Sequence, residues 1–351
     1  MVDTKTATRK AFMAAAWYSG LASLLSPFFA GIGAILMLHR VGAPRNPFGM
    51  NRHLTVEPAF LEAALANLQR AGYDFVTMDE AVERIASGGR GRRFLAVTLD
   101  DGYSDNLENA VPLFHKYRVP YTIYIAPGLT SGDADLWWEL VEDVVASNET
   151  IRFFTNSGRV ELHCAGAHAK RRAYETLIDH MTQDIDEVAQ RRLAADLADM
   201  YAIDRKAHRQ TSLLTWSQLR ALVDDPLCTI GAHTLNHPML KRIDDGRARF
   251  EIGQCASVIE TELGARPRHF AYPYGSRAAV GPREVELARE AGYASAVTTR
   301  HGTILSRHAS HLQSLPRISV NGRFEDVSNL RVMLSGVTVP AANRGRRFVT
   351  V

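Results

Sequence analysis

Two adjacent carboxylates, Asp100 and Asp101, follow a short apolar run at residues 94–97. Such a run is typical of a strand that is buried on both faces. Because successive strand side chains point to opposite faces, a turn at Gly102 would be needed to bring both carboxylates into one pocket. One carboxylate can then bind a cation while the other handles protons. The alternative is an acidic helix start that is capped within residues 104–106.

His233 and His237 stand four residues apart after a second apolar run at residues 227–230. On a helical turn this spacing places both imidazoles on one face, although Pro238 favours a turn that enters a helix over regular helix. Two histidines and one aspartate form a facial ligand set that leaves positions open for water and substrate. A divalent ion held there would bring the pKa of its water to about 7 and polarise a carbonyl, which predicts hydrolysis of an amide or ester. Non-haem iron oxygenases use the same ligands, but commonly on a jelly-roll strand pattern.

These residues need a scaffold that brings strand ends together. From residue 33 onwards the chain alternates short apolar runs with amphipathic stretches, which is the pattern of a parallel α/β fold. Strands are expected at residues 33–38, 74–77, 94–97, 121–125, 227–230, 294–298 and 315–320, and around residue 270. His39, Tyr274 and Arg317 also fall at or just after expected strand ends. In a closed barrel that edge carries the active site, so these residues are expected to converge there.

The composition limits the possible classes of protein. The 351 residues, 46% hydrophobic and 23% charged, suffice for one large α/β domain with additions or for two small domains. A net charge of +3 and the lack of a nucleic-acid-binding motif argue against a nucleic-acid partner. The three cysteines share no C-x-x-C spacing, which argues against a disulfide framework and suits a reducing compartment.

Three segments carry a family resemblance. Thr98–Gly102, His233–His237 and Tyr272–Gly275, in this order, resemble the first three motifs of the polysaccharide deacetylases with a NodB-homology domain, carbohydrate esterase family 4. The resemblance covers about residues 31–320. It implies a distorted (β/α) barrel that removes N-acetyl, and sometimes O-acetyl, groups from sugars such as N-acetylglucosamine.

The resemblance also implies roles for individual residues. Asp100 would be the general base, and the metal ligands would be Asp101, His233 and His237. The backbone N–H of Tyr274 would help to hold the oxyanion. The expected ion is Zn²⁺, with Co²⁺ or Ni²⁺ as alternatives, and the expected partner is an N-acetylated glycan substrate.

The sequence also departs from the family pattern. Ala271 stands where the third motif usually carries an arginine, and we expect Arg317 to supply that charge and to orient Asp100. The usual late leucine-x-histidine and aspartate-tryptophan motifs are not apparent. The segment Leu38-His39-Arg40-Val41 resembles the one that supplies a histidine in the poly-N-acetylglucosamine deacetylase branch. We therefore predict that His39 protonates the leaving amine, the alternative being a hydrogen-bonded histidine at a strand end.

The predicted organisation has three parts. Residues 1–30 form an amphipathic segment with a helix over about residues 6–25, and residues 31–338 form the barrel with a helical insertion at about residues 132–212. Residues 339–351 form a loose basic tail. The apolar stretch at residues 11–30 resembles a signal peptide or anchor but is interrupted by glycine, serine and proline. We expect a cytoplasmic protein with peripheral membrane contact, or alternatively an exported protein with an uncleaved anchor.

The resulting hypothesis is a metal-dependent N-deacetylase that acts on a chitooligosaccharide or an exopolysaccharide containing N-acetylglucosamine. Within enzymes, the alternative is a hydrolase of another amide or ester on the same barrel. Because two late motifs are missing, a barrel that binds glycan without turnover is a further alternative. The oligomeric state is not predicted.

Overall fold

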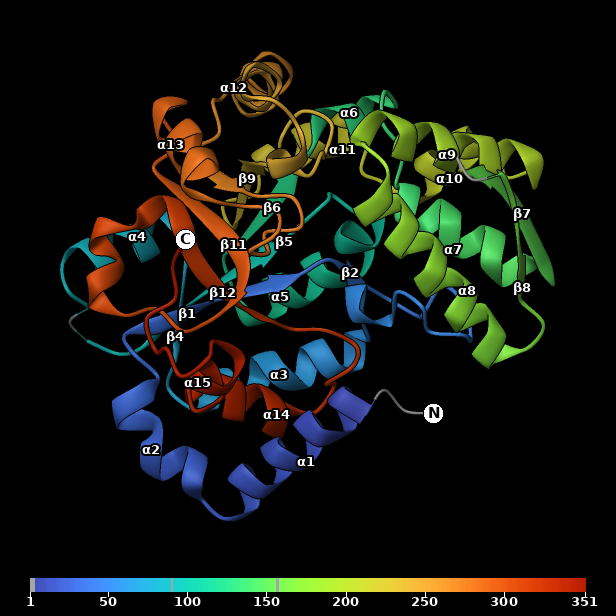
Figure 1. The fold of residues 1–351 in the computed structure, drawn as a ribbon. Helices are drawn as coiled ribbons and strands as arrows, with labels where there is room; N and C mark the ends of the chain where they lie inside the picture. The colour runs from blue at the N-terminus through green and yellow to red at the C-terminus, as the bar shows by residue number, and fades with distance from the viewer. Residues whose placement is uncertain (1–3, 90, 156–157) are drawn as a thin grey trace.

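A ring of seven parallel strands forms the centre of the described chain (Figure 1). The computed structural model describes residues 4–89, 91–155 and 158–351. Around the ring the strand order is β1-β12-β11-β10-β9-β6-β5, and β5 pairs again with β1. The bounds are β1 Gly33–Leu38, β5 Phe94–Leu99, β6 Tyr121–Ile125, β9 Cys228–Ala232, β10 His269–Ala271, β11 Ser295–His301 and β12 Leu315–Ser319. The predicted distorted barrel is confirmed, with strand bounds that differ from the expected ones by at most three residues.

The distortion has a visible cause at β5. Its first half pairs with the short strand β4 (Asp74–Val76), and its second half pairs with β6 on the same edge. The opposite edge of β5 pairs with β1 along its whole length, from Gly33 opposite Phe94 to Leu38 opposite Leu99. The barrel is therefore closed by seven strands while an eighth strand joins it from outside.

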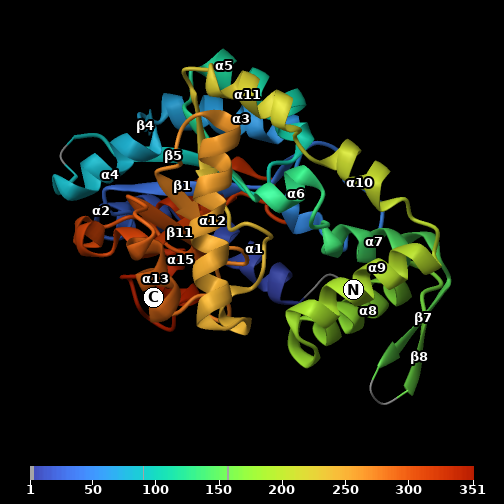
Figure 2. The same cartoon turned by 90° about the horizontal axis from the view of Figure 1, so that it is seen from above.

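Side chains alternate between the inside of the barrel and the surrounding helices. Ile35 and Ala96 belong to an inner cluster with Val297, whereas Leu36 and Leu95 join the cluster beneath the helices. All six positions of β1 and of β5 are buried, as expected for strands covered on both faces. The helices that surround the barrel are α3 Pro58–Arg70, α4 Met78–Ala86, α5 Val111–Tyr117, α6 Pro127–Ser131, α11 Trp216–Val223, α12 Asp245–Leu263, α13 Pro282–Glu290 and α14 Val327–Leu334 (Figure 2).

A helical segment lies beside the barrel, where the sequence predicts an insertion (Figures 1 and 2). It consists of α7 Trp137–Ser147, the antiparallel hairpin β7 Thr150–Thr155 and β8 Gly158–His163, α8 Ala167–Asp179, α9 Glu187–Met200 and α10 Arg205–Ser212. Residues 156–157, between β7 and β8, lie outside the described residues. Trp137, Val141, Ile151 and Leu197 contribute to a hydrophobic cluster of this segment. The short parallel strands β2 Arg40–Val41 and β3 Thr55–Val56 lie between the segment and the barrel.

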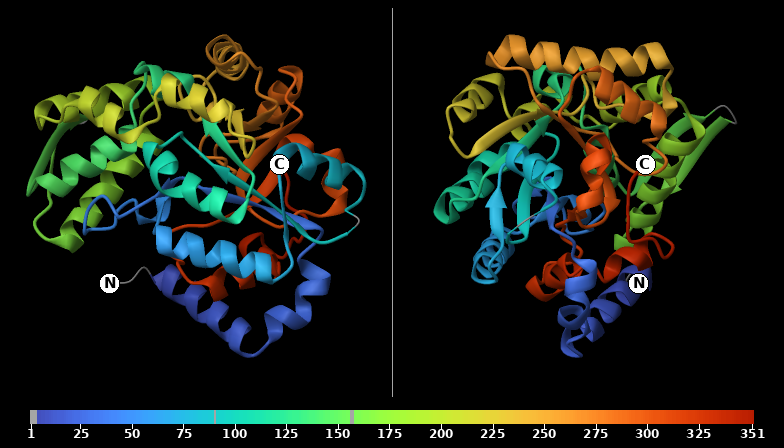
Figure 3. Two further views of the ribbon diagram at one scale, coloured as in Figure 1. Left: turned by 180° about the vertical axis from the view of Figure 1, so that it is seen from behind. Right: turned by 90° about the vertical axis from the view of Figure 1, so that its left-hand side faces the viewer.

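The N-terminal segment forms two helices, so the expectation of one helix over residues 6–25 is wrong. Helix α1 spans Thr4–Tyr18 and α2 spans Leu21–Phe29, with a bend of 94° between them. Gly20 at the break has φ 73°, a conformation that glycine adopts without strain. Both helices lie against α14 and α15 (Thr338–Ala342) at one end of the molecule (Figure 3). No single helix among the described residues has the length and apolarity to cross a membrane; α1 and α2 meet that criterion only as a bent pair.

The C-terminal residues are packed, so the expectation of a loose tail is wrong. Val349 is buried, and its carbonyl oxygen lies 3.0 Å from His308 Nε2. The hydroxyls of Thr350 and Ser314 are hydrogen-bonded at 2.6 Å. The guanidinium of Arg347 lies over the ring of Phe29, 4.4 Å from its centroid. The segment is basic as predicted, and apolar and hydrogen-bonding partners hold it on the barrel.

Candidate metal and catalytic site

The carboxylate of Asp101 lies between the imidazoles of His233 and His237 at the carboxyl ends of β5 and β9. Asp101 Oδ1 is 3.4 Å from His233 Nε2 and 3.3 Å from His237 Nε2, and all three side chains are buried. The three ligand atoms lie within 4.8 Å of one another. The predicted ligands are therefore brought together.

This geometry fits a divalent ion better than it fits hydrogen bonds. Asp101 Oδ1 is buried without a hydrogen-bond partner among the described residues, which is costly for a carboxylate oxygen. Ligands at about 2.0–2.1 Å around a tetrahedral Zn²⁺ would stand about 3.3 Å apart. The two measured separations match that value, so the residues fit the Zn²⁺ that the resemblance implies.

The backbone is strained where the ligands are held. Asp101, Thr234, His237 and Tyr274 all have φ between 58° and 73°, a backbone conformation that residues other than glycine rarely adopt. Asp101 and Gly102, two and three residues past the end of β5 at Leu99, both have positive φ and turn the chain there, as expected for two adjacent carboxylates to share one pocket. Such strain costs about 1–3 kcal/mol per residue and persists where the surrounding structure fixes it, commonly at functional sites.

Neighbouring groups fix the orientation of the two histidines. The carbonyl oxygen of Ala271 on β10 lies 2.7 Å from His233 Nδ1. With a proton on Nδ1, the imidazole presents the lone pair of Nε2 to an ion. The rings of Trp138 and Tyr274 lie 4.9 and 5.1 Å from the ring of His237.

The electrostatics favour an ionised Asp101. Burial by itself would raise its pKa, but the adjacent imidazoles of His233 and His237 outweigh this effect and hold the pKa well below its usual range. An anionic carboxylate is the form that binds a metal ion.

The second carboxylate, Asp100, is held by Arg317. Arg317 Nη1 and Nη2 donate to the two oxygens of Asp100 at 2.7 and 2.6 Å, and both residues are almost fully buried. Burial would raise the pKa of Asp100, but the charge and hydrogen bonds of Arg317 lower it. Arg317 was expected at the end of a strand, and this is wrong, because it is the middle residue of β12. Its long side chain extends from there to Asp100. Ala271 on β10 carries no charge, and the positive charge beside Asp100 comes from Arg317, as expected.

His39 lies next to Asp100 because β1 and β5 are in register. Leu38 pairs with Leu99, so the residues that follow them are neighbours, and His39 Nε2 is 3.9 Å from Asp100 Oδ2. Burial lowers the pKa of His39, although Asp100 and Asp101 oppose the shift. His39 is therefore a neutral imidazole at neutral pH and lies beside the expected base.

Tyr274 follows β10, and its ring lies beside His237 of the cluster of Asp101, His233 and His237. Its hydroxyl accepts a hydrogen bond from Trp137 Nε1 at 3.0 Å, and its carbonyl oxygen accepts one from Thr299 Oγ1 at 2.6 Å. Among the residues that the structure describes, the Tyr274 N–H meets no acceptor. This amide is consistent with the predicted oxyanion donor.

A buried ionic network beside the site was not predicted from the sequence. Arg40 contacts Asp105 at 2.7 Å and Glu139 at 2.9 Å, and Arg45 contacts Glu139 at 3.0 Å. Glu139 is almost fully buried on α7 between Trp138 and Leu140. An acidic residue within such an apolar run was the available signal. The network joins the segment after β1 to the helical insertion and so positions His39 relative to Trp138.

A cavity of about 680 Å³ adjoins the barrel mouth. Met37, Thr299 and Ser319, on β1, β11 and β12, contribute to its floor, and α1 and α15 contribute to its walls. Thr299 also bonds to Tyr274, which connects the cavity to the candidate site. The cavity has the volume expected for a small-molecule site.

Comparisons with known proteins agree with this geometry. A family model described as polysaccharide deacetylase matches residues 87–296. The Streptococcus pyogenes deacetylase PplD in complex with acetate is 18% identical with a TM-score of 0.58, covering 86% of this chain and 97% of that chain. IcaB from Ammonifex degensii is 17% identical with a TM-score of 0.53, covering 86% and 96%.

The polysaccharide deacetylase BC0361 from Bacillus cereus is 18% identical with a TM-score of 0.53, covering 86% of this chain and 68% of that chain. A search of curated protein sequences gave no significant match. At these identities the solved structures support the fold, and the family model carries the assignment of the chain.

Proposed function

Because this chain belongs to the polysaccharide deacetylase family, we propose that it is a metal-dependent hydrolase of N-acetyl groups on an oligo- or polysaccharide containing N-acetylglucosamine. A chitooligosaccharide and an exopolysaccharide both satisfy this description. The observation that carries the proposal is the cluster of Asp101, His233 and His237 beside an Asp100 that Arg317 holds ionised.

In this proposal Asp101, His233 and His237 hold a divalent ion, with Zn²⁺ as the first candidate and Co²⁺ or Ni²⁺ as alternatives. When bound, such an ion would polarise the amide carbonyl and lower the pKa of a water. The ligand separations near 3.3 Å and the buried unpartnered oxygen of Asp101 support this assignment.

Asp100 acts as general base and accepts the proton of the water that attacks the acetyl carbon. Arg317 keeps Asp100 anionic and directs both oxygens. The Tyr274 N–H stabilises the negative charge that develops on the carbonyl oxygen. The neutral imidazole of His39, whose Nε2 lies 3.9 Å from Asp100 Oδ2, takes up the proton from Asp100 and passes it to the nitrogen of the leaving amine as the C–N bond breaks. The products are acetate and the free amino sugar.

The proposed location is the cytoplasm, with peripheral contact to a membrane through residues 1–30. The three free cysteines suit a reducing compartment. An exported form with an uncleaved anchor is the alternative, and fractionation of cells that produce the full chain decides between the two locations.

The test is acetate release from N-acetylglucosamine oligomers by the full chain, first stripped of metal and then reconstituted with Zn²⁺ or Co²⁺. We expect release that depends on metal and is lost in the Asp100→Asn variant. If metal binds but neither the oligomers nor a panel of other amides and esters is hydrolysed, the proposed reaction is wrong. Binding of the oligomers without release would instead identify a glycan-binding barrel.

A further inference from the structure

Large apolar side chains are concentrated on the outer surface of α1 and α2. Eleven large hydrophobic residues are exposed among the described residues, and six of them lie between residues 12 and 28. They are Phe12, Trp17, Tyr18, Leu21, Leu24 and Phe28. Tyr18, Leu24 and Phe28 have 86%, 71% and 66% of their surface exposed. Isolated exposed apolar residues are ordinary, but six of them on one pair of helices indicate an interaction surface.

The charged side chains of residues 4–30, which include both helices, are all basic. Residues 4–30 contain Lys5, Arg9 and Lys10 and no aspartate or glutamate. Arg347 from the C-terminal segment lies over Phe29 at the end of α2, and Arg346 beside it is exposed. An apolar helical face flanked by cations is the composition of a helix that lies in the interface of an anionic bilayer.

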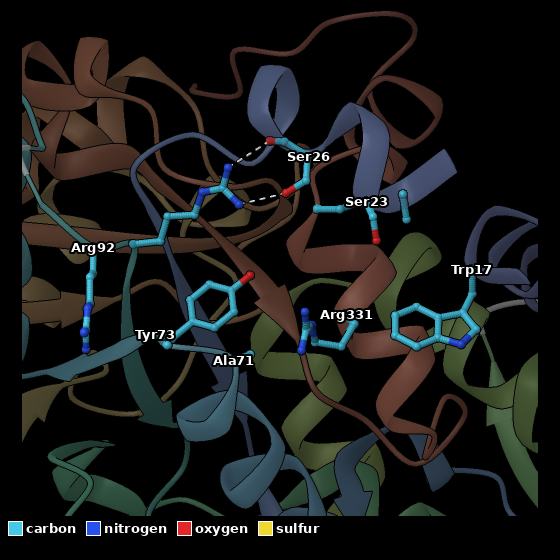
Figure 4. Close-up of a pocket in the computed structure, with 11 residues that line it drawn as sticks. Trp17, Ser23, Ser26, Ala71, Tyr73, Arg92 and Arg331 are labelled. Carbon is cyan, nitrogen blue, oxygen red and sulfur yellow. Dashed lines mark hydrogen bonds between the residues drawn. The ribbon is translucent and has the colours of Figure 1, made fainter. Parts of the chain in front are cut away.

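A pocket of about 260 Å³ opens beside this face, between α2 and the barrel (Figure 4). Its basic and hydroxyl-bearing side chains are Arg92, Arg93, Arg331, Ser23, Ser26, Ser335 and Tyr73, and its aromatic edge is Trp17. None of the residues that line the pocket is acidic.

The arginines of the pocket are held by neutral groups. Arg93 donates to Ser26 Oγ at 2.7 Å and to the Ser26 carbonyl oxygen at 3.1 Å, the contacts drawn as dashed lines in Figure 4. Arg331 donates to Asn67 Oδ1 at 3.1 Å. Within the described residues, no carboxylate forms an ion pair with Arg92, Arg93 or Arg331. Guanidinium groups without a carboxylate partner bind phosphate with strong hydrogen bonds, so a pocket lined by three arginines and several hydroxyls has the composition of a phosphate site.

We propose that α1 and α2 dock on an anionic phospholipid bilayer, with one lipid phosphate bound in the pocket of Arg92, Arg93 and Arg331. The exposed side chains of Leu21, Leu24 and Phe28 enter the acyl region, and Trp17 and Tyr18 lie at its polar boundary. Because α1 also forms a wall of the cavity at the barrel mouth, docking places that mouth close to the membrane surface.

The test is flotation of the full chain with vesicles of phosphatidylcholine alone or with 30% phosphatidylglycerol. We expect flotation with the anionic vesicles and at least tenfold weaker association with the neutral ones. The double substitution Arg92→Gln with Arg331→Gln should weaken anionic binding by roughly tenfold or more. Leu24→Ser with Phe28→Ser should weaken it similarly, because both side chains lose their apolar contact with lipid.

Matched controls replace exposed residues of the same kinds elsewhere. Arg192→Gln with Arg277→Gln removes two exposed arginines, and Phe250→Ser removes an exposed phenylalanine of α12. These controls should float like the wild type, and all variants should keep their melting temperature and their acetate release from a soluble oligomer. Loss of flotation in the controls as well would overturn the proposed site.

Three further outcomes would overturn the proposal. Failure to float with either vesicle would show that a membrane is not the partner of this surface. Equal flotation with both vesicles would show that the pocket does not bind an anionic lipid phosphate. A stable dimer that Leu24→Ser with Phe28→Ser dissociates, without flotation of the wild type, would make the face a contact between two copies of this chain. This inference rests on the membrane contact proposed for residues 1–30. None of these outcomes depends on whether the chain hydrolyses acetamides, so the membrane site and the proposed reaction fail separately.

Discussion

Arg317 donates two hydrogen bonds to Asp100, at 2.7 and 2.6 Å, across 217 positions of the chain. The arginine is itself fixed, because its Nε donates to the Thr298 carbonyl oxygen at 2.9 Å and its Nη1 to Thr98 Oγ1 at 3.0 Å. The orientation of the proposed base is therefore set by β5, β11 and β12 together.

Replacing Arg317 should damage both stability and catalysis. Arg317→Gln leaves the Asp100 charge buried without its partner, and the free energy of unfolding should fall by about 3–5 kcal/mol. Arg317→Lys should lie between the wild type and the Gln variant, because an ammonium cannot form both hydrogen bonds in the same geometry. Urea unfolding and kcat measured on the same preparations check this. A Gln variant with wild-type kcat would show that Asp100 does not need the arginine.

Substitution of each adjacent aspartate by asparagine, which is neutral and of similar size, should show that Asp100 and Asp101 have different roles. Asp101→Asn should lose the bound metal, because it removes the anionic ligand from the cluster with His233 and His237. Asp100→Asn should keep the metal but lower kcat by roughly 10²–10⁴-fold, as expected for loss of a general base. Metal content by elemental analysis and acetate release provide the two readouts. Loss of metal from both variants would show that Asp100 is also a ligand.

His39→Asn should lower kcat by roughly 10²-fold or more without change in metal content. His39 Nε2 is 3.9 Å from Asp100 Oδ2, so the two side chains are expected to act as one unit in proton transfer. The double variant with Asp100→Asn should then be only slightly slower than Asp100→Asn alone. Additive losses in the double variant would assign His39 a role that is independent of the base.

The sequence predicts this site well where motifs follow apolar strands. The runs before His39, Asp100 and His233 identify their strands, and parallel strands of a barrel necessarily bring their carboxyl ends together. The contact of Arg317 with Asp100 was expected, because Ala271 stands where the family pattern has an arginine. The position of Arg317 in the middle of β12 was not expected.

Other features depend on packing between distant segments, which local patterns do not encode. The break between α1 and α2 follows from the positive φ of Gly20, and a single glycine in an apolar stretch does not specify a bend of 94°. The burial of Glu139 depends on Arg40 and Arg45, which come from another part of the chain. The packing of Val349 likewise depends on His308.

His301 should make stability depend on pH below neutrality. Burial, reinforced by the charge of Arg9, lowers its pKa to about 4, whereas the unfolded chain has a value near 6.5. Between these values the unfolded chain binds the proton more readily. The stability that His301 contributes is therefore complete above about pH 6.5 and is lost as the pH falls toward 4.

The comparison is between the wild type and His301→Gln, which retains an amide for the hydrogen bond to Thr338 Oγ1. From pH 7 to pH 4 the wild type should lose up to about 3 kcal/mol more free energy of unfolding than the variant. Urea titrations at several pH values measure this difference. Parallel losses in the two proteins would show that His301 keeps its ordinary pKa in the folded state.

Substitution of Tyr274 tests whether its backbone amide, and not its side-chain hydroxyl, stabilises the oxyanion in the proposed reaction. Its hydroxyl accepts a hydrogen bond from Trp137 Nε1, and its ring lies 5.1 Å from that of His237. Tyr274→Phe removes only the hydroxyl and leaves the N–H, the ring and the backbone with φ 60° in place. We expect kcat to change by less than about threefold, since the donor to the developing oxyanion is retained. Trp137→Phe is the matched control, because it removes the other partner of the same hydrogen bond. A loss of more than 100-fold in Tyr274→Phe alone would assign the hydroxyl, and not the amide, to the chemistry.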